Sequence, residues 1–364
     1  MRFVDEYRDP ELAKKLVARI HRRSVTPVSL MEFCGGHTVT IVKHGIRQLV
    51  SATVKMMSGP GCPVCVTDNS DLDKAIALAK LPDVIICTFG DMLKVPGSFS
   101  SLQQAKAEGS DIRIVYSTID ALEIARRNPS RPVIFIGIGF ETTAPTIAAS
   151  VLQAEKEGMR NYHVLSLGKL CPPVIRALLD KGEVRLDGII CPGHVSAIIG
   201  SRPYEFIPRE YGIACAISGF EPLDVLLGVD MLIAQIESRQ PRVEIAYRRG
   251  VRAEGNRQAL ELMDIIFEAG ETRWRGIGVV PQSGLKLRKR YERFDADRVF
   301  PVDPGPTHEP EGCLCGEILR GVKRPMDCQL FRQVCRPEYP VGPCMVSYEG
   351  ACSTYYLYGD ADEG

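Results

Sequence analysis

The sequence predicts an α/β protein with two doubly wound, Rossmann-like parallel-sheet domains and a smaller C-terminal domain rich in cysteine. Between residues 28 and 240, short apolar runs alternate with longer helical patterns, which is typical of repeated βαβ units. The apolar runs are nearly continuous, as expected of strands that are covered on both faces. Beyond this region, six of the 13 cysteines lie between Gly312 and Cys352.

Each expected element is a short run within this pattern. The expected strands are Val28–Phe33, Ala52–Met57, Val84–Thr88, Arg113–Tyr116, Val133–Ile138, His163–Leu167, Gly188–Cys191 and Ala214–Ser218. The expected helices between them are Asp71–Ala79, Ile119–Arg127, Thr146–Lys156, Val174–Asp180 and Leu223–Glu237. A further helix is expected over Asn256–Glu268, followed by loops rich in glycine and proline.

A break near Ser117–Asp120 favours two smaller domains over one large sheet. We therefore expect a first α/β domain over residues 28–118 and a second over 119–240. Residues 241–364 would form the helix and the cysteine-rich domain. Residues 1–27 would form an N-terminal helix that packs on this C-terminal domain.

The charge balance and the N-terminal sequence indicate which binding partners and which cellular compartment to expect. Lysine plus arginine equals aspartate plus glutamate, 45 each, so nothing indicates a nucleic-acid or membrane partner. The first twenty residues are charged and lack the apolar core of a secretion signal, and no apolar run is long enough to span a bilayer. The expected location is the cytoplasm, where cysteine clusters more often bind metal or react than form structural disulfides.

The C-terminal cysteines indicate a metal centre. Soft thiolates held by irregular backbone suit an iron–sulfur cluster or a zinc ion. One such centre takes about four ligands, so two thiols would remain beside it. The six cysteines are Cys313, Cys315, Cys328, Cys335, Cys344 and Cys352.

Reactive side chains also follow the predicted strands, where ligands bind in open α/β sheets. In MEFCGGHT, Cys34 ends an apolar strand, and the glycines after it allow close approach of a ligand. A helix beginning here, together with His37, would favour the Cys34 thiolate. The alternative is a buried cysteine near a helix cap.

A second strand end carries GPGCPVC, with Cys62 and Cys65 in a C-x-x-C spacing. This spacing at a strand-to-helix turn is typical of a dithiol/disulfide redox motif. Half of a zinc site is the alternative, but the chain has no second C-x-x-C or H-x-x-x-H to complete it.

A third strand end carries GIGFETTAP. It begins like a dinucleotide-binding fingerprint, but Thr142 stands where the third glycine belongs, so the indication of a nucleotide is weak. We expect Glu141, Thr142 and Thr143 to line a polar pocket or to cap the next helix.

The fourth strand end is CPGHVS, with His194 and Ser196. His194 would act as an acid/base, a hydrogen-bond donor or an iron ligand, and a structural histidine is the alternative. Cys87, Cys171 and Cys215 lie in or beside apolar runs and are interpreted as packed thiols.

Together, MEFCGGHT, GPGCPVC, GFETTAP, CPGHVS and the C-terminal cysteine segment resemble the HypD family of [NiFe] hydrogenase maturation proteins, from about Leu30 to Cys352. The resemblance implies a scaffold, formed with the chaperone HypC, that holds an iron atom while it acquires two cyanides and one carbon monoxide. HypE would donate the cyanide, and the Fe(CN)₂CO unit would pass through HypC to the hydrogenase large-subunit precursor.

The resemblance also implies residue roles. Cys34 would bind the transient Fe(II), and Cys62 with Cys65 would be an exchangeable dithiol. His194, Glu141 and Thr142 would line the cleft, with His37, Thr143 and Ser196 supporting them. A [4Fe–4S] cluster would be held by Cys313, Cys328, Cys335 and Cys352, leaving Cys315 and Cys344 as a redox pair. Spacing alone permits other sets, including Cys315 as a ligand.

Two other functions fit the same residues. One is a cluster-dependent oxidoreductase that reduces a protein disulfide and has no need of Cys34. The other is a zinc-stabilised binding module without redox activity. The scaffold is the preferred hypothesis, and it would act stoichiometrically and not as an enzyme that turns over a free substrate.

Overall fold

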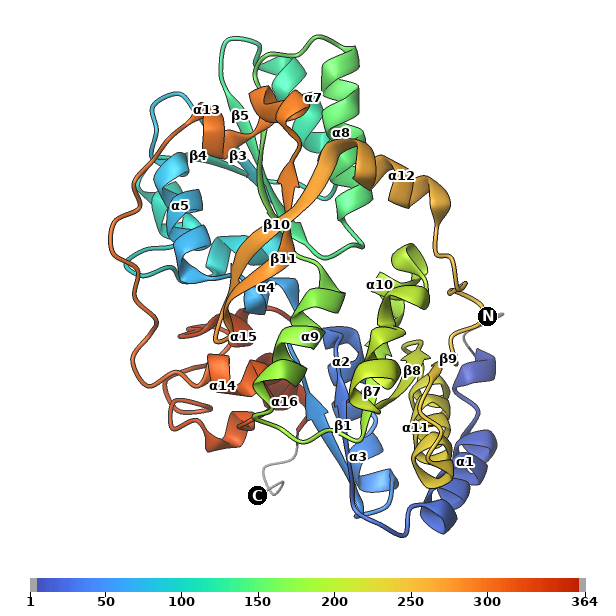
Figure 1. Ribbon diagram of the computed structural model, residues 1–364. Coiled ribbons are helices and arrows are strands. Elements are labelled where there is room, and N and C mark those ends of the chain that lie inside the picture. The colour runs from blue at the N-terminus through green and yellow to red at the C-terminus, as the bar shows by residue number, and fades with distance from the viewer. Residues whose placement is uncertain (1–4, 360–364) are drawn as a thin grey trace.

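The structure is a computed structural model that describes residues 5–359, and it contains two parallel sheets, one above the other in Figure 1. The lower, five-stranded sheet has the order β2-β1-β7-β8-β9. Its strands are β1 (Val28–Glu32), β2 (Val54–Ser58), β7 (Gly188–Pro192), β8 (Ala214–Ser218) and β9 (Val243–Ile245). The upper, four-stranded sheet has the order β4-β3-β5-β6. Its strands are β3 (Ile85–Thr88), β4 (Asp111–Ile114), β5 (Val133–Gly139) and β6 (Tyr162–Gly168).

The predicted α/β class with parallel sheets is confirmed, and each of the eight predicted strands is present. The expected division between residues 118 and 119, however, does not separate the sheets. β3 and β4 precede that point but pair with β5 and β6, whereas β1 pairs with β7. The polar break at Ser117–Asp120 is instead a capping box, in which Ser117 and Asp120 each accept a backbone N–H of the other at the start of a helix.

Three groups of buried apolar side chains hold these layers. One face of the five-stranded sheet packs against α1 (Pro10–Arg23), α2 (Gly35–Lys43), α3 (Ile46–Leu49) and α11 (Pro222–Ser238). One face of the four-stranded sheet packs against α7 (Thr118–Arg127), α8 (Ala144–Lys156) and α12 (Arg257–Ile266). The third core is continuous across both sheets and includes α4 (Pro63–Val66), α5 (Asn69–Ala79), α6 (Leu102–Ala107), α9 (Cys171–Lys181) and α10 (Gly193–Ile199).

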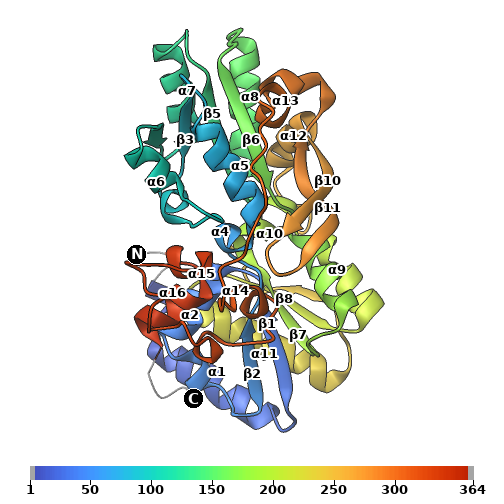
Figure 2. The ribbon, with the colours of Figure 1, turned by 90° about the vertical axis from the view of Figure 1, so that its left-hand side faces the viewer.

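The remaining helices are short. They are α13 (Ala296–Val299), α14 (Cys315–Leu319), α15 (Pro343–Val346) and α16 (Ala351–Tyr358), the 3₁₀ turns η1 (Asp5–Tyr7), η2 (Gly90–Lys94), η3 (Arg202–Tyr204), η5 (Lys289–Phe294) and η6 (Pro325–Asp327), and the π-helical turn η4 (Ile207–Tyr211). The cysteine-rich segment with α14–α16 lies beside the five-stranded sheet (Figure 2).

A β-hairpin replaces the loops expected after α12. Its strands are β10 (Phe267–Trp274) and β11 (Gly278–Leu287), and β10 begins where the predicted helix would have continued to Glu268. β11 contacts β6, where the Ser166 hydroxyl donates to the Leu285 carbonyl at 2.6 Å. At the tip, Gly276 (φ +70°) packs so closely on Gly316 of α14 that a Cβ would lie 2.3 Å from its Cα. The hairpin therefore connects the four-stranded sheet with the cysteine-rich segment.

The N-terminal helix α1 packs on α11, not on the cysteine-rich segment as expected. Asp9 caps the helix by accepting the N–H groups of Glu11 and Leu12. On its side, Arg19 donates to Asp230 of α11 at 2.8 Å. Across the described residues, none of the helices has both the length and the apolar character needed to cross a bilayer.

Candidate functional site

Cys34 lies in the turn between β1 and α2, and this turn packs against the turn that carries the GPGCPVC motif. Cys34 is the N-cap of α2, with extended backbone directly after β1, and it is buried. Gly61 of the GPGCPVC motif approaches it so closely that a Cβ there would lie 2.3 Å from the Cys34 nitrogen. The Gly35 N–H also donates to the Gly61 carbonyl at 3.0 Å. The two predicted motifs therefore form one compact unit, and the glycine is needed for close packing of the backbones.

The carboxyl of Glu32 fixes the same turn. It accepts the Cys34 N–H at 2.8 Å and the hydroxyl of Thr38. Burial raises the pKa of Glu32 to about 7, against the lowering effect of these hydrogen bonds.

The unligated Cys34 thiol favours its protonated form. Burial is the main cause of its raised pKa, and the negative charge of Glu349 adds to it, while the N–H groups of Gly36 and His37 act in the opposite direction. The N–H groups at the start of α2 therefore lower the pKa of Cys34, as expected. The expected help from the His37 side chain is absent, because burial lowers the pKa of His37 to about 4 and leaves the ring neutral near pH 7. Its Nε2 lies 3.2 Å from the Ser218 carbonyl and 3.0 Å from that of Gly219.

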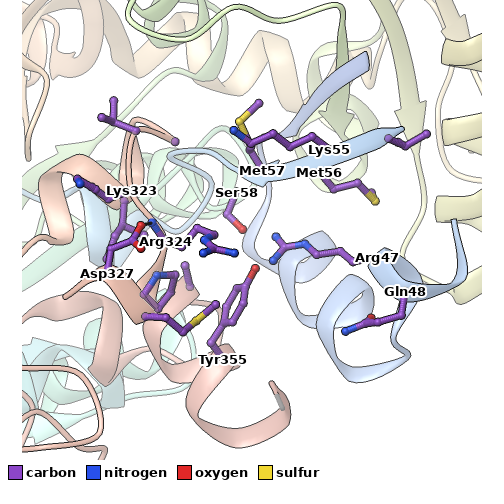
Figure 3. A pocket seen from close by; sticks show the side chains of 17 residues that line it. Arg47, Gln48, Lys55, Met56, Met57, Ser58, Lys323, Arg324, Asp327 and Tyr355 are labelled. Carbon is purple, nitrogen blue, oxygen red and sulfur yellow. Dashed lines mark hydrogen bonds between the residues drawn. The ribbon is translucent and has the colours of Figure 1, made fainter. Parts of the chain in front are cut away.

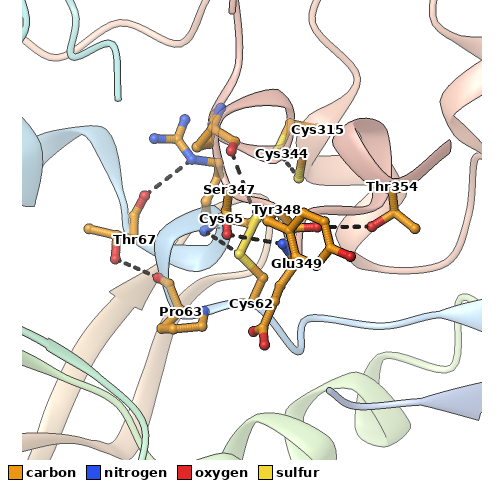
Figure 4. The surroundings of a disulfide bond; sticks show 12 residues. Cys62, Pro63, Cys65, Thr67, Cys315, Cys344, Ser347, Tyr348, Glu349 and Thr354 are labelled. Atoms are coloured by element: carbon orange, nitrogen blue, oxygen red, sulfur yellow. Dashed lines mark hydrogen bonds between the residues drawn. A yellow bond between two sulfur atoms is a disulfide. The ribbon is translucent and has the colours of Figure 1, made fainter. Parts of the chain in front are cut away.

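Two pairs of cysteines lie side by side near this turn (Figure 4). Cys62 and Cys65 form a disulfide at the start of α4. The sulfurs of Cys315 and Cys344 lie 2.8 Å apart and share a hydrogen bond, which lowers the pKa of Cys315 and raises that of Cys344. Cys65 Sγ lies 3.9 Å from the carbonyl of Pro343, the residue before Cys344. The Cys62–Cys65 disulfide therefore packs against the segment that carries Cys344.

All six C-terminal cysteines line one cavity, here called the cysteine cavity. Its other walls are the apolar side chains of Ile318, Leu330, Phe331 and Met345, together with Gly342. A Cβ on Gly342 would lie 2.6 Å from Cys313 Sγ, so a larger residue would fill the space beside that sulfur. Thiolates in an apolar enclosure are the donor set of an iron–sulfur cluster. Within residues 5–359, no group of three or more His, Cys, Asp or Glu side chains is arranged to hold a single metal ion.

Glu141 follows β5 and is buried with one oxygen unpaired. Its Oε1 accepts the Cys171 N–H at 2.9 Å, while Oε2 has no hydrogen-bond partner among the described residues. Burial raises the pKa of Glu141 to about 7. Burial also raises the pKa of the Cys171 thiol, and the negative charge of Glu141 adds to it. Cys171, interpreted from sequence as a packed thiol, therefore contacts this carboxyl through its backbone N–H.

The hydroxyls predicted near this strand end mostly satisfy backbone. Thr143 is the N-cap of α8, but its hydroxyl turns back to the carbonyls of Ile138 and Phe140, both at 3.3 Å. Ser196 donates to the Pro192 carbonyl at 2.7 Å within its own segment. Thr142 is half-buried beside Glu141.

His194 is the second residue of α10, and it is more exposed than the buried His37 although neighbouring side chains cover part of its ring. Both rings stack on Phe220, with centroid distances of 3.8 Å for His194 and 4.7 Å for His37. Burial lowers the pKa of His194 as well. Phe220 thus links the first and fourth predicted strand-end motifs through two aromatic contacts.

Sequence reasoning missed four contributors to this site: Glu32, Cys171, Phe220 and Glu349. Glu32 and Glu349 stand beside predicted cysteines, so their proximity in the chain was an available signal. Phe220 carries no such signal. Its role depends on β8 and β1 lying in one sheet, on either side of β7, although they are far apart in the chain.

Comparison with known proteins identifies the family of this chain. The HypD family model, described as "Hydrogenase formation hypA family", matches residues 11–359. The chain is 46% identical to hydrogenase maturation factor HypD2 of Bradyrhizobium diazoefficiens, covering 99% of this chain and 97% of that protein. It is 46% identical to HypD of Rhodobacter capsulatus, covering 99% of each, and 42% identical to HypD of Escherichia coli, covering 98% of each. The motif-bearing turns and the whole-length similarity together show that this chain belongs to the HypD family.

Proposed function

We propose that this protein is a hydrogenase maturation factor that acts in the cytoplasm as a scaffold for the Fe(CN)₂CO unit. The observation that carries the proposal is the position of Cys34. Its turn is fixed by Glu32 and Gly61, so Cys34 packs against the loop that carries the Cys62–Cys65 disulfide. The names of its relatives as hydrogenase maturation factors support the same function.

In this proposal the iron is cargo, bound by Cys34 and by a cysteine of HypC. A thiolate donor stabilises low-spin Fe(II) that carries cyanide and carbonyl ligands. Because the pKa of Cys34 is raised by burial, iron binding must displace a proton from its sulfur. HypE would donate cyanide, and HypC would carry the completed unit to the hydrogenase large-subunit precursor.

Glu141 would contact the ligands of the iron. Its Oε2 is the unpaired polar atom of this strand end, and its raised pKa allows it to donate a proton or a hydrogen bond near neutral pH. His194 would bind from the exposed side, held in place by stacking on Phe220. Thr142 would complete the polar lining.

The cysteine cavity fits a [4Fe–4S] cluster held by Cys313, Cys328, Cys335 and Cys352. When bound, the cluster would supply single electrons next to the cysteine pairs. Cys315 and Cys344 would remain as a dithiol whose sulfurs are already 2.8 Å apart. Exchange with the Cys62–Cys65 disulfide would return that pair to thiols and oxidise Cys315 and Cys344 to a disulfide, with the two protons passing from one pair to the other.

A cluster-dependent oxidoreductase is the second candidate, favoured by the same contact between the two cysteine pairs. A reductase of this kind would need Cys62, Cys65, Cys315 and Cys344, but not Cys34. The two functions therefore differ in what the loss of Cys34 would do.

Infrared spectroscopy of the protein copurified with HypC tests the scaffold. We expect cyanide and carbonyl stretches in the wild type and none in Cys34→Ala, with the cluster absorption retained. Cys87→Ala, which removes a thiol buried in β3, is the matched control and should keep the bands. Bands that survive in Cys34→Ala would assign the iron to another residue. Absence of bands in every sample with an intact cluster would favour the oxidoreductase.

A further inference from the structure

A cavity of about 660 Å³ runs along the outer edge of the five-stranded sheet. β2 is the terminal strand of that sheet, and all five of its residues, Val54–Ser58, line the cavity. Successive side chains of a strand point to opposite faces, so five consecutive residues can line one cavity only if it follows the strand edge. The cavity therefore exposes backbone as well as side chains.

The hydrogen bonds to β1 show which groups face this edge. The Val28 N–H donates to the Thr53 carbonyl at 2.8 Å, and the Gly59 N–H donates to the Glu32 carbonyl at 2.9 Å. In a parallel ladder every second residue pairs with the same neighbour, so Lys55 and Met57 pair with β1. The N–H and C=O of Met56 consequently point away from β1 and into the cavity.

The opposite wall comes from the cysteine-rich segment and α16 (Figure 3). The basic residues of the lining are Arg47 of α3, Lys55 of β2 itself, and Lys323 and Arg324 of the cysteine-rich segment, with Asp327 as the acidic residue. The Asp327 carboxylate already accepts the Arg324 backbone N–H at 2.7 Å. Arg47 lies 4.8 Å over the ring of Tyr355, and Lys55 and Lys323 are exposed. The cavity thus combines a strand edge with an exposed lysine from β2 and another from the facing segment.

We propose that this edge binds an extended, acidic segment of a partner protein, which adds to β2 as a further strand. Backbone amides are needed to pair with the outward N–H and C=O of Met56, and a polypeptide supplies them. Carboxylates on the segment would lie opposite Lys55 and Lys323, complementing their charge. Because the cavity follows all five residues of β2, the bound segment would be about as long as β2.

Fluorescence anisotropy with a labelled, short peptide of alternating glutamate and valine tests the proposal on the full-length protein. We expect saturable binding that weakens as salt rises from about 0.05 M to about 0.3 M. The same peptide with N-methyl groups on alternate amides of its pairing edge should bind about tenfold more weakly, because it cannot donate to the strand. A lysine–valine peptide should not bind.

Charge reversal locates the site. The double variant Lys55→Glu with Lys323→Glu should weaken binding by about tenfold or more. Both side chains are exposed, so the fold should persist, which circular dichroism checks. Lys106→Glu, an exposed lysine in the last turn of α6 that is not part of the cavity lining, is the matched control and should leave the affinity unchanged.

Four results would overturn the proposal. Equal binding of the N-methylated peptide would reduce the interaction to surface charge without strand pairing. Equal affinity in the double variant would place the peptide elsewhere. If the wild type failed to bind but the full-length variant Asp360→Asn, Asp362→Asn, Glu363→Gln did bind, the chain's own acidic terminus would be the occupant; failure of both would exclude the site.

Discussion

The ends of β1 and β5 each hold a buried carboxyl, but the two carboxyls have different surroundings. Both oxygens of Glu32 are used, one by the Cys34 N–H and the other by the Thr38 hydroxyl. Glu141 uses Oε1 for the Cys171 N–H and leaves Oε2 unpaired within the described residues. Burial raises the pKa of both to about 7.

The pKa therefore does not distinguish the roles of these two residues, whereas their hydrogen bonds do. A buried polar atom without a partner is unusual in a folded protein and indicates either strain or a missing ligand. Glu32 is accordingly a positioning residue for the Cys34 turn, and Glu141 is the residue with an oxygen still available to a ligand.

The pH dependence of Glu141→Gln should give the largest difference. The folded-state pKa of about 7 lies above the ordinary value of 4.5, so the folded protein retains a proton that the unfolded chain loses. The stability that this proton contributes is fully present below pH 4.5, the ordinary pKa. It is lost as the pH rises from 4.5 to about 7, and the free energy of unfolding falls by about 3 kcal/mol over that range. The Gln variant should match the wild type near the ordinary value and exceed its stability above neutrality, as measured by urea unfolding. A pH-independent difference would contradict this.

Gly61→Ala should disrupt the Cys34 turn next most strongly. The added Cβ would meet the Cys34 and Phe33 backbones at 2.3–2.5 Å, and backbone cannot move aside as a flexible side chain can. We expect a loss of about 2.5 kcal/mol in the free energy of unfolding. Gly90→Ala, whose Cβ would meet only Ile114 Cγ2 at 3.8 Å, is the control and should cost less than about 0.5 kcal/mol. Equal losses would show that close packing is not the reason for the glycine.

Replacing Glu32 and Glu141 by alanine in separate variants compares how much their hydrogen bonds contribute to the free energy of unfolding. Near pH 5, where both are mainly neutral, Glu32→Ala should lower the free energy of unfolding by about 2 kcal/mol more than does Glu141→Ala. The reason is that Glu32→Ala removes two hydrogen bonds, from the Cys34 N–H and the Thr38 hydroxyl, and Glu141→Ala removes one. Urea unfolding of the two variants measures this, and a larger loss for Glu141→Ala would reverse the assigned roles.

Phe220→Leu should have the smallest effect, about 1 kcal/mol, from the lost stacking with His37 and His194. Since burial lowers the pKa of His194, removing part of its cover should move that pKa upward, as followed by the ring-proton NMR signals of His194. An unchanged titration would mean that Phe220 does not cover the ring.

The strands could be predicted from sequence because each is a local apolar run, but their order could not. Pairing of β1 with β7 joins segments that are separated by the whole four-stranded sheet. The hairpin was missed because β10 carries Gly270 and a register shift between Gly270 and Thr272, which weaken its alternating pattern. The capping box at Ser117 was mistaken for a boundary, since both are polar interruptions.

The site could be predicted where motifs carry the chemistry. The cysteines gather around one cavity, and Cys315 and Cys344 lie together, although the choice of cluster ligands stays a prediction. The protonation of His37 could not be anticipated, because its burial depends on packing against Phe220 from a distant strand end. The unpaired oxygen of Glu141 likewise depends on where α9 is placed.

The interleaving of the two sheets also constrains how the protein is made on the ribosome. β1 and β2 emerge early, yet their neighbour β7 is synthesised only after every strand of the other sheet. The four-stranded sheet can therefore close first, while the Cys34 segment waits with unpaired backbone and exposed apolar side chains. During that interval Cys34, Cys62 and Cys65 lie on the least folded part of the nascent chain. Under the proposed function, iron would therefore bind Cys34 only after β7 has been synthesised.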